Sequence, residues 1–178
     1  MNRIQDYSKL ESDITKWIRD YYYSNGIQSL VVGVSGGIDS AVVSTLCAKT
    51  GLPTYVVRMP LESTHQNTKL SDLHAQQLAE EYDNVTNVQV ELSSVYGSLL
   101  HSINWWSEAQ HFDKKEFTSD ELANANTKSR IRMVTLYQIA GAKKGIVVGT
   151  GNKVEDYGIG FYTKYGDGGV DIAPIADL

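Results

Sequence analysis

The fold of this chain is decided by the stretch Leu30-Val31-Val32-Gly33-Val34-Ser35-Gly36-Gly37-Ile38-Asp39-Ser40. Its first half is apolar and β-branched, which predicts a central parallel strand that is buried on both faces. Ser35, Gly36 and Gly37 follow, and their small side chains would let a phosphate approach the backbone closely. From about Ile38 the pattern predicts a helix, whose free N–H groups and dipole favour an anion. The stretch therefore predicts a strand, a turn and a helix start that together bind an anion.

The acid at Asp39 separates this turn from the common phosphate-binding loops. No Lys followed by Ser or Thr comes after the glycines, and the stretch has no G-x-G-x-x-G pattern. A carboxylate beside a polyphosphate is unfavourable unless a divalent cation lies between them, so Asp39 indicates Mg²⁺. The alternative is a tight turn in which Asp39 only interacts with the helix dipole. The pattern S-G-G-I-D-S resembles the pyrophosphate loop of the N-type ATP pyrophosphatases, which adenylate an oxygen and release pyrophosphate.

The composition is typical of a globular enzyme. The 178 residues suffice for one domain with a core, and 42% are hydrophobic and 21% charged. The net charge of −5 argues against a nucleic-acid partner, and no apolar run is long enough to cross a membrane. The N-terminus lacks a signal-peptide core, so we expect a cytoplasmic protein. The single cysteine, Cys47, is expected to be an inert thiol in the core.

The hydrophobic pattern predicts alternating strands and helices. Strands are expected over 30–34, 54–59, 87–92 and 146–149, and helices over 3–23, from 38, over 64–83, after 93 and from 124–126 to about 144. This order is typical of an α/β fold with a doubly wound parallel sheet. The expected inward-facing residues are Ala41, Val42, Thr45 and Leu46 on the second helix, and Leu70, Leu73, Leu78 and Tyr82 on the third.

Two further strand ends carry charged residues. The fourth strand leads into Gly149-Thr150-Gly151-Asn152-Lys153-Val154-Glu155, so glycines and an acid again follow a strand. Because parallel strands end at one edge of a sheet, Asp39 and Glu155 are plausible joint ligands of Mg²⁺ on a nucleotide. By itself, Glu155 could equally be an acid at a helix start. Arg58 ends the second strand, where ligands of open α/β sheets lie, or it is a surface cation.

Two later motifs narrow the interpretation to one family. The patterns G-T-G-N-K-x-E from Gly149 and G-F-Y-T-K-Y-G-D-G-G-x-D-I-x-P-I-x-D-L from Gly160 resemble ammonia-dependent NAD⁺ synthetase. The S-G-G-I-D-S loop, V-R-M-P and K-S-R-I-R-M fit the same family in the same order. The resemblance implies a Rossmann-like fold of the adenine nucleotide α hydrolase type. It also implies that ATP activates the nicotinate carboxylate of deamido-NAD⁺ as an adenylate, and that ammonia then forms NAD⁺, with release of AMP and pyrophosphate.

The resemblance also implies roles for individual residues. Mg²⁺ would be held by Asp39 and Glu155, and the catalytic residues would be Asp39 and Lys164. Deamido-NAD⁺ would contact Arg130, Lys164 and Asp171. ATP would contact Gly33, Val34, Ser35, Gly36, Gly37, Ile38, Asp39, Ser40, Arg58 and Thr150. Family members are homodimers, which makes the N-terminal helix and Trp105-Trp106 candidate contacts.

Two departures from the family pattern leave other functions open. The spacing from Glu155 to Gly160 is one residue longer than in many relatives, and family members continue beyond Leu178. We therefore expect residues 1–178 to be a single domain that is C-terminally incomplete relative to the family. The alternatives are another ligase of the N-type ATP pyrophosphatases and a nucleotide-binding module without turnover.

Overall fold

The computed structural model describes residues 6–61, 65–113 and 115–178. The helices are α1 (Tyr7–Ser24), α2 (Ile38–Lys49), α3 (His65–Glu81), α4 (Ser93–Ala109) and α5 (Glu121–Ala142), and the π-helix η1 spans Val154–Ile159. The strands are β1 (Ser29–Val34), β2 (Thr54–Arg58), β3 (Val85–Gln89) and β4 (Gly145–Val148). Every expected strand is present, although β3 begins two residues earlier than the pattern predicts. Residues 3–5 of the expected first helix, and residue 64 of the third, lie outside the described residues.

The strands form one parallel sheet in the order β3-β2-β1-β4. The central strand is β1, in which Leu30 pairs with Thr54 on one side and Ile146 on the other. Leu30, Val31 and Val32 have no exposed surface, as expected of a strand covered on both faces. The doubly wound α/β fold predicted from the sequence is confirmed. The C-terminal segment extends the sheet by a single parallel bridge between Val148 and Ile172.

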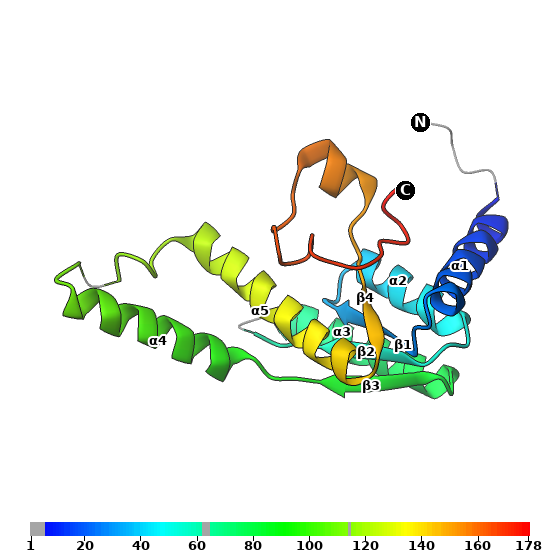
Figure 1. Cartoon of the computed structure of the whole chain (residues 1–178), viewed down its shortest axis with the longest axis horizontal. Helices are drawn as coiled ribbons and strands as arrows, with labels where there is room; N and C mark the ends of the chain where they lie inside the picture. The colour runs from blue at the N-terminus through cyan, green and yellow to red at the C-terminus, as the bar shows by residue number, and fades with distance from the viewer. Residues whose placement is uncertain (1–5, 62–64, 114) are drawn as a thin grey trace.

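Helices cover both faces of the sheet (Figure 1). Side chains of β1 alternate between two cores, so that Leu30 and Val32 face one and Val31 faces the other. The first core is completed by α1, α2 and α3, and the second by α4 and α5. This arrangement leaves the carboxyl ends of the strands free for a ligand, as in other open α/β sheets.

Two helices are rotated relative to the sequence expectation. On α2, Val42 is 41% exposed, and the buried residues are Ser40, Val43, Ser44, Leu46, Cys47 and Ala48. On α3, Leu70 and Leu73 are 46% and 55% exposed, while Leu78 is buried as expected. Successive helical residues are about 100° apart, so a phase error of one position is enough to exchange an inward for an outward side chain. The expected inert Cys47 thiol is fully buried, and burial raises its pKa to about 12.

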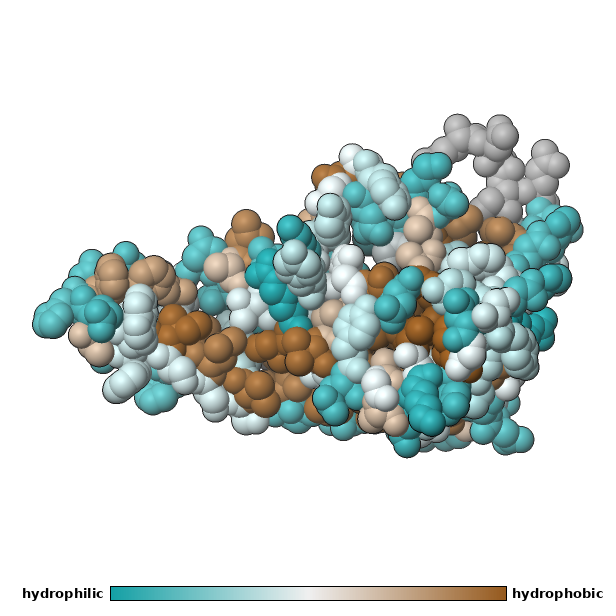
Figure 2. Space-filling view, viewed as in Figure 1, coloured by the Kyte–Doolittle hydropathy of each residue, from teal (hydrophilic) through white to brown (hydrophobic). Residues whose placement is uncertain are grey.

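The helix α4 and the N-terminal part of α5 form an arm that extends away from the sheet (Figure 1), whereas the C-terminal part of α5 packs on the sheet through Met133, Leu136 and Ala140. Near its far end, the ring of Trp106 lies 5.8 Å from that of Phe112 and 5.9 Å from that of Phe117, measured between centroids. All three side chains remain 42–49% exposed. Figure 2 shows apolar residues continuing along the arm toward the body of the molecule. No helix in the described part of the chain is long and apolar enough to cross a bilayer.

Candidate functional site

The turn between β1 and α2 has the geometry of an anion site. Gly36 adopts a φ of +88°, which an L side chain rarely allows. The Ser40 hydroxyl donates to the Gly37 carbonyl at 2.9 Å and accepts from the Ser35 N–H at 3.2 Å, and these bonds fix the turn. Within the described residues, the N–H groups of Ile38, Asp39 and Ser40 donate no hydrogen bond. These amides are therefore free to bind an anion at the helix start.

A cavity of about 350 Å³ opens beside this turn, at the carboxyl ends of the strands. Gly33 lines it, and a Cβ at this position would lie 3.2 Å from Met59 Cε and 3.3 Å from Leu136 Cδ1. The lining comes from β1, the segment after β2, α3, α5, β4 and the residues that follow it, and the loop after η1. It comprises Gly33, Val34, Ser35, Met59, Pro60, Thr68, Ser71, Asp72, Ser129, Arg132, Met133, Leu136, Val147, Val148, Gly149, Thr150, Asp167 and Val170.

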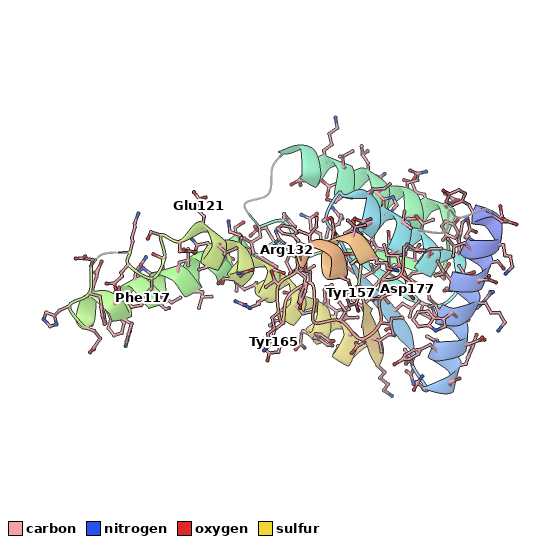
Figure 3. All side chains as sticks on the ribbon, turned by 90° about the horizontal axis from the view of Figure 1, so that it is seen from above. Phe117, Glu121, Arg132, Tyr157, Tyr165 and Asp177 are labelled. Carbon is pink, nitrogen blue, oxygen red and sulfur yellow. The ribbon has the colours of Figure 1, made fainter. Side chains whose placement is uncertain are left out.

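Three charged residues line the cavity, and none of them was assigned a role from the sequence, although Arg132 and Asp167 lie within its motifs. They are Asp72 of α3, Arg132 of α5 and Asp167 of the loop after η1. Arg132 is half-buried, and burial lowers the pKa of its guanidinium. It donates through Nε to the Met59 carbonyl at 3.3 Å and through Nη2 to the Leu61 carbonyl at 3.4 Å. Figure 3 places Arg132 near the centre of the molecule, far from Phe117 at the end of the arm.

The loop that carries Asp167 is held against α5 by a compact set of hydrogen bonds. The Ser129 hydroxyl donates to Asp167 Oδ1 at 2.7 Å and accepts from the Asp167 N–H at 3.0 Å. The Thr163 hydroxyl donates to Asn126 Oδ1 at 2.8 Å. At Gly166, a Cβ would lie only 2.2 Å from Ser129 Oγ, so this close approach requires glycine. The loop is thus ordered by the protein itself on the open side of the cavity.

Asp171 connects this loop to the sheet. Its Oδ2 accepts from the Val147 N–H at 2.8 Å, and its Oδ1 accepts from the Tyr137 hydroxyl at 3.0 Å. Burial, followed by the hydrogen bond to Asp171, raises the pKa of Tyr137 to about 12. Both oxygens of the carboxylate therefore have partners in the protein, and Asp171 supports the position of the loop. Its predicted contact with deamido-NAD⁺ stays a prediction.

Some of the other predicted ligand-binding residues line the cavity, and others lie outside it. Of the predicted ATP contacts, Gly33, Val34, Ser35 and Thr150 line it, whereas Arg58 and the five residues that follow Ser35 do not, namely Gly36, Gly37, Ile38, Asp39 and Ser40. The Arg58 guanidinium is bound by Asp72 Oδ1 at 2.5 Å, Asn87 Oδ1 at 2.9 Å and Gln89 Oε1 at 2.8 Å. Arg130 and Lys164 are exposed outside the cavity, where Arg130 Nε donates to the Lys164 carbonyl at 3.1 Å.

The two acids predicted to hold Mg²⁺ lie in turns that follow adjacent parallel strands. Asp39 follows β1 and Glu155 follows β4, so both are at the carboxyl edge of the sheet. Both are half-buried, and neither carboxylate has an ion-pair partner among the described residues. No group of three or more possible ligands is present in the described part of the chain. Two free carboxylates fit Mg²⁺, which often binds one or two acids and completes its shell with phosphates and water.

The residues around Glu155 form the π-helix η1, which ends at Gly160 with a φ of +74°. The Asn152 side chain caps its start by accepting from the N–H groups of Val154 and Glu155, both at 3.0 Å. At the other end, the Phe161 N–H donates to the Glu155 carbonyl at 2.8 Å. A π-turn holds one more residue than an α-turn. The extra residue noted in the sequence therefore falls in an element that can accommodate it.

Comparisons with known proteins point to one family for this chain. The family model described as NAD synthase matches residues 10–178. An NH₃-dependent NAD⁺ synthetase of Alkaliphilus oremlandii is 35% identical over 98% of this chain and 67% of its own length. One of Finegoldia magna is 33% identical over 97% of this chain and 65% of its own length. This chain thus spans about two thirds of the length of these curated relatives.

Solved structures show the same similarity. The NMN synthetase of Francisella tularensis superposes with a TM-score of 0.83 at 30% identity, and covers 98% of this chain and 66% of its own. The NH₃-dependent NAD synthetase of Campylobacter jejuni, in complex with the nitrate ion, superposes with a TM-score of 0.81 at 27% identity. That match covers 98% of this chain and 69% of the other.

Proposed function

The chain belongs to the NAD synthase family, and we propose that it takes part in the ATP-dependent amidation of deamido-NAD⁺ by ammonia. The observation that carries the proposal is the cavity between the anion-binding turn after β1 and the loop that carries Asp167. One edge of this cavity includes Ser35 of the S-G-G-I-D-S loop. The other includes Asp167 of the motif that begins at Gly160. A nucleotide bound to the turn would therefore face a second substrate held by the loop.

The reaction needs charge neutralisation and alignment more than it needs a nucleophilic side chain. The nicotinate carboxylate attacks the α-phosphorus of ATP and gives an adenylate and pyrophosphate, and ammonia then displaces AMP to give the amide. We propose that the free N–H groups of Ile38, Asp39 and Ser40 bind the departing phosphates. Asp39 and Glu155 hold Mg²⁺, which when bound neutralises charge on the polyphosphate. Lys164 would neutralise the negative charge of the acid substrate, and the loop that carries Asp167 would fix the orientation of that substrate.

A mononucleotide acid is the second candidate substrate. The observation that favours it is the TM-score of 0.83 with the NMN synthetase of Francisella tularensis. Nicotinate mononucleotide carries the same carboxylate, so the two reactions share the adenylation step. They differ only in whether the site must also hold a second nucleotide.

The test is product formation with each acid in turn. The protein would be supplied with ATP, Mg²⁺, ammonium and either deamido-NAD⁺ or nicotinate mononucleotide, and pyrophosphate and the amide product would be measured. We expect pyrophosphate only when an acid is present, and a loss of at least about 100-fold in Asp39→Asn, because the variant would lose a carboxylate proposed to hold the charge-neutralising ion. Asp83→Asn, a change at an exposed acid in the connection between α3 and β3, is the matched control.

The possible outcomes separate the alternatives. Pyrophosphate release without any acid, or at equal rates with unrelated acids, would refute the proposal. ATP binding without turnover would favour the nucleotide-binding module. Full activity in Asp39→Asn would remove the metal role of that residue.

We also propose that the chain forms a homodimer through the α4–α5 arm. The support is the exposed aromatic surface of this arm, where Trp105 is 68% and Trp106 49% exposed. Sedimentation should show a dimer in the wild type and a shift to monomer in Trp105→Lys. A monomer at high concentration in the wild type would contradict this assembly.

A further inference from the structure

Arg132 differs from the other cavity-lining charges in the partners that it has. Its two hydrogen bonds go to backbone carbonyls, those of Met59 and Leu61. Within the described residues no carboxylate lies close enough to form an ion pair with it. A carbonyl oxygen accepts a hydrogen bond but carries no net charge. No acidic side chain of the described residues therefore neutralises the positive charge of Arg132.

Both acidic side chains that line the cavity already have hydrogen-bond or ion-pair partners in the protein. Asp72 pairs with Arg58 at 2.5 Å. Asp167 accepts from the Ser129 hydroxyl at 2.7 Å and from the Thr163 N–H at 3.1 Å. Among the described residues, the cation that faces the cavity without an acidic partner is thus Arg132. A half-buried guanidinium without a counter-ion is costly, and a bound oxyanion would remove this cost.

The hydrogen-bonding capacity of Arg132 leads to the same conclusion. A guanidinium has five N–H donors, and two of them serve the carbonyls of Met59 and Leu61. The others include both N–H groups of Nη1. The two carbonyl bonds hold the planar head in place, and the free donors suit the oxygens of a phosphate or carboxylate.

We propose that Arg132 is a binding residue for an oxyanion of the substrates in this cavity, either a phosphate of ATP or an acidic group of the dinucleotide. The proposal rests on the proposed function for the identity of the ligands, but not on turnover. A purely structural role, in which Arg132 only fixes the segment from Met59 to Leu61, is the opposing interpretation.

The test is ligand binding by calorimetry to the wild type, Arg132→Gln and Arg132→Lys. Mg·ATP, magnesium pyrophosphate and deamido-NAD⁺ would be titrated separately, and thermal unfolding would be recorded for each protein. Gln keeps an N–H donor for a carbonyl but loses the charge, whereas Lys keeps the charge. Arg19→Gln, at an exposed position on α1, is the matched control.

We expect Arg132→Gln to bind one class of ligand about 10- to 100-fold more weakly, which is the loss expected for a charge-assisted hydrogen bond. Arg132→Lys should recover part of the affinity, and the unfolding temperature should stay close to that of the wild type. Weakened Mg·ATP and pyrophosphate binding would assign the oxyanion to ATP. Weakened deamido-NAD⁺ binding alone would assign it to the acid substrate.

Three outcomes would overturn the inference. They are unchanged affinities in Arg132→Gln, equal weakening of all ligands together with a lower unfolding temperature in both variants, and no binding of any of these ligands by the wild type. Because binding is measured without turnover, an inactive protein whose Arg132→Gln variant binds Mg·ATP weakly would refute the proposed reaction and keep the inference.

Discussion

Replacement of Gly149 by Ala should weaken the attachment of the C-terminal segment to the sheet. Gly149 follows β4 and is buried, and a Cβ there would lie 2.5 Å from Val170 Cγ2 and 3.0 Å from Val170 Cβ. The segment cannot easily move away, because the Gly149 N–H donates to the Ile172 carbonyl at 2.7 Å and the Asp171 N–H donates to the Val147 carbonyl at 3.0 Å. The new methyl group would thus be inserted between two hydrogen-bonded stretches of backbone.

Overpacking of this kind costs about 1–3 kcal/mol of unfolding free energy. For a chain of this size the loss corresponds to a drop in unfolding temperature of about 2–12 °C. Val170→Ala removes the two Cγ atoms, so the double variant Gly149→Ala/Val170→Ala should be less destabilised than the sum of the single changes. Urea unfolding of all four proteins would measure this coupling.

Gly97→Ala on α4 is the control, because no atom lies within 4 Å of its added Cβ. It should raise stability by about 0.5–1 kcal/mol, since Ala is the better helix former. The reasoning would be refuted if Gly149→Ala were as stable as the wild type, or if the two changes at Gly149 and Val170 were additive.

Three further predictions follow from individual contacts. Tyr137→Phe removes the hydroxyl that lies 2.9 Å from the Gly169 carbonyl and 3.0 Å from Asp171 Oδ1, and should lower the unfolding free energy by about 0.5–1.5 kcal/mol in urea titrations, whereas an unchanged value would mean that the hydroxyl contributes nothing. Burial lowers the pKa of His74, whose Nε2 lies 2.8 Å from Ser44 Oγ, so the folded protein binds a proton less readily than the unfolded chain. Its unfolding temperature should therefore fall as the pH drops below about 6.5 and level off below the folded-state pKa, and His74→Gln should show a smaller fall over the same range. The Cys47 thiol, with a pKa raised to about 12 by burial, should react with a thiol reagent only as fast as the protein unfolds, and fast labelling of the native protein would contradict its burial.

The fold was predictable because the apolar patterns that indicate its strands and helices are local in the sequence and recur along the chain. The run from Leu30 to Val34 is apolar at both alternating sets of positions, and only a strand covered on two faces buries all of them. The order of strands and helices then leaves few arrangements, since parallel strands require crossover connections. The rotation of α2 and α3 was less predictable, because apolar residues such as Val42 and Leu73 occur on both faces of these helices.

The extra residue before Gly160 shows how an irregularity of sequence can be contained. In η1 the chain widens by one residue between Val154 and Ile159, and Gly160 then adopts a left-handed conformation with a φ of +74°. The Phe161 N–H still reaches the Glu155 carbonyl at 2.8 Å. The widened turn is therefore closed by a hydrogen bond to a residue in the first turn of η1. The spacing between Glu155 and Gly160 reveals the extra residue in the sequence. The backbone geometry of the π-helix shows how the chain accommodates that residue.

Arg130 and Arg132 show why the charged lining of the cavity was harder to predict than its glycines. The glycine motifs are continuous in sequence, so their position in a turn is also their position in the site. The two arginines are on α5, where residues two apart point about 200° away from each other. The sequence motif contains both, and nothing in their spacing decides which one faces the ligand. The packing of Met133 and Leu136 against the sheet fixes the rotation of α5, and that rotation turns Arg132 into the cavity and leaves Arg130 beside the Lys164 carbonyl.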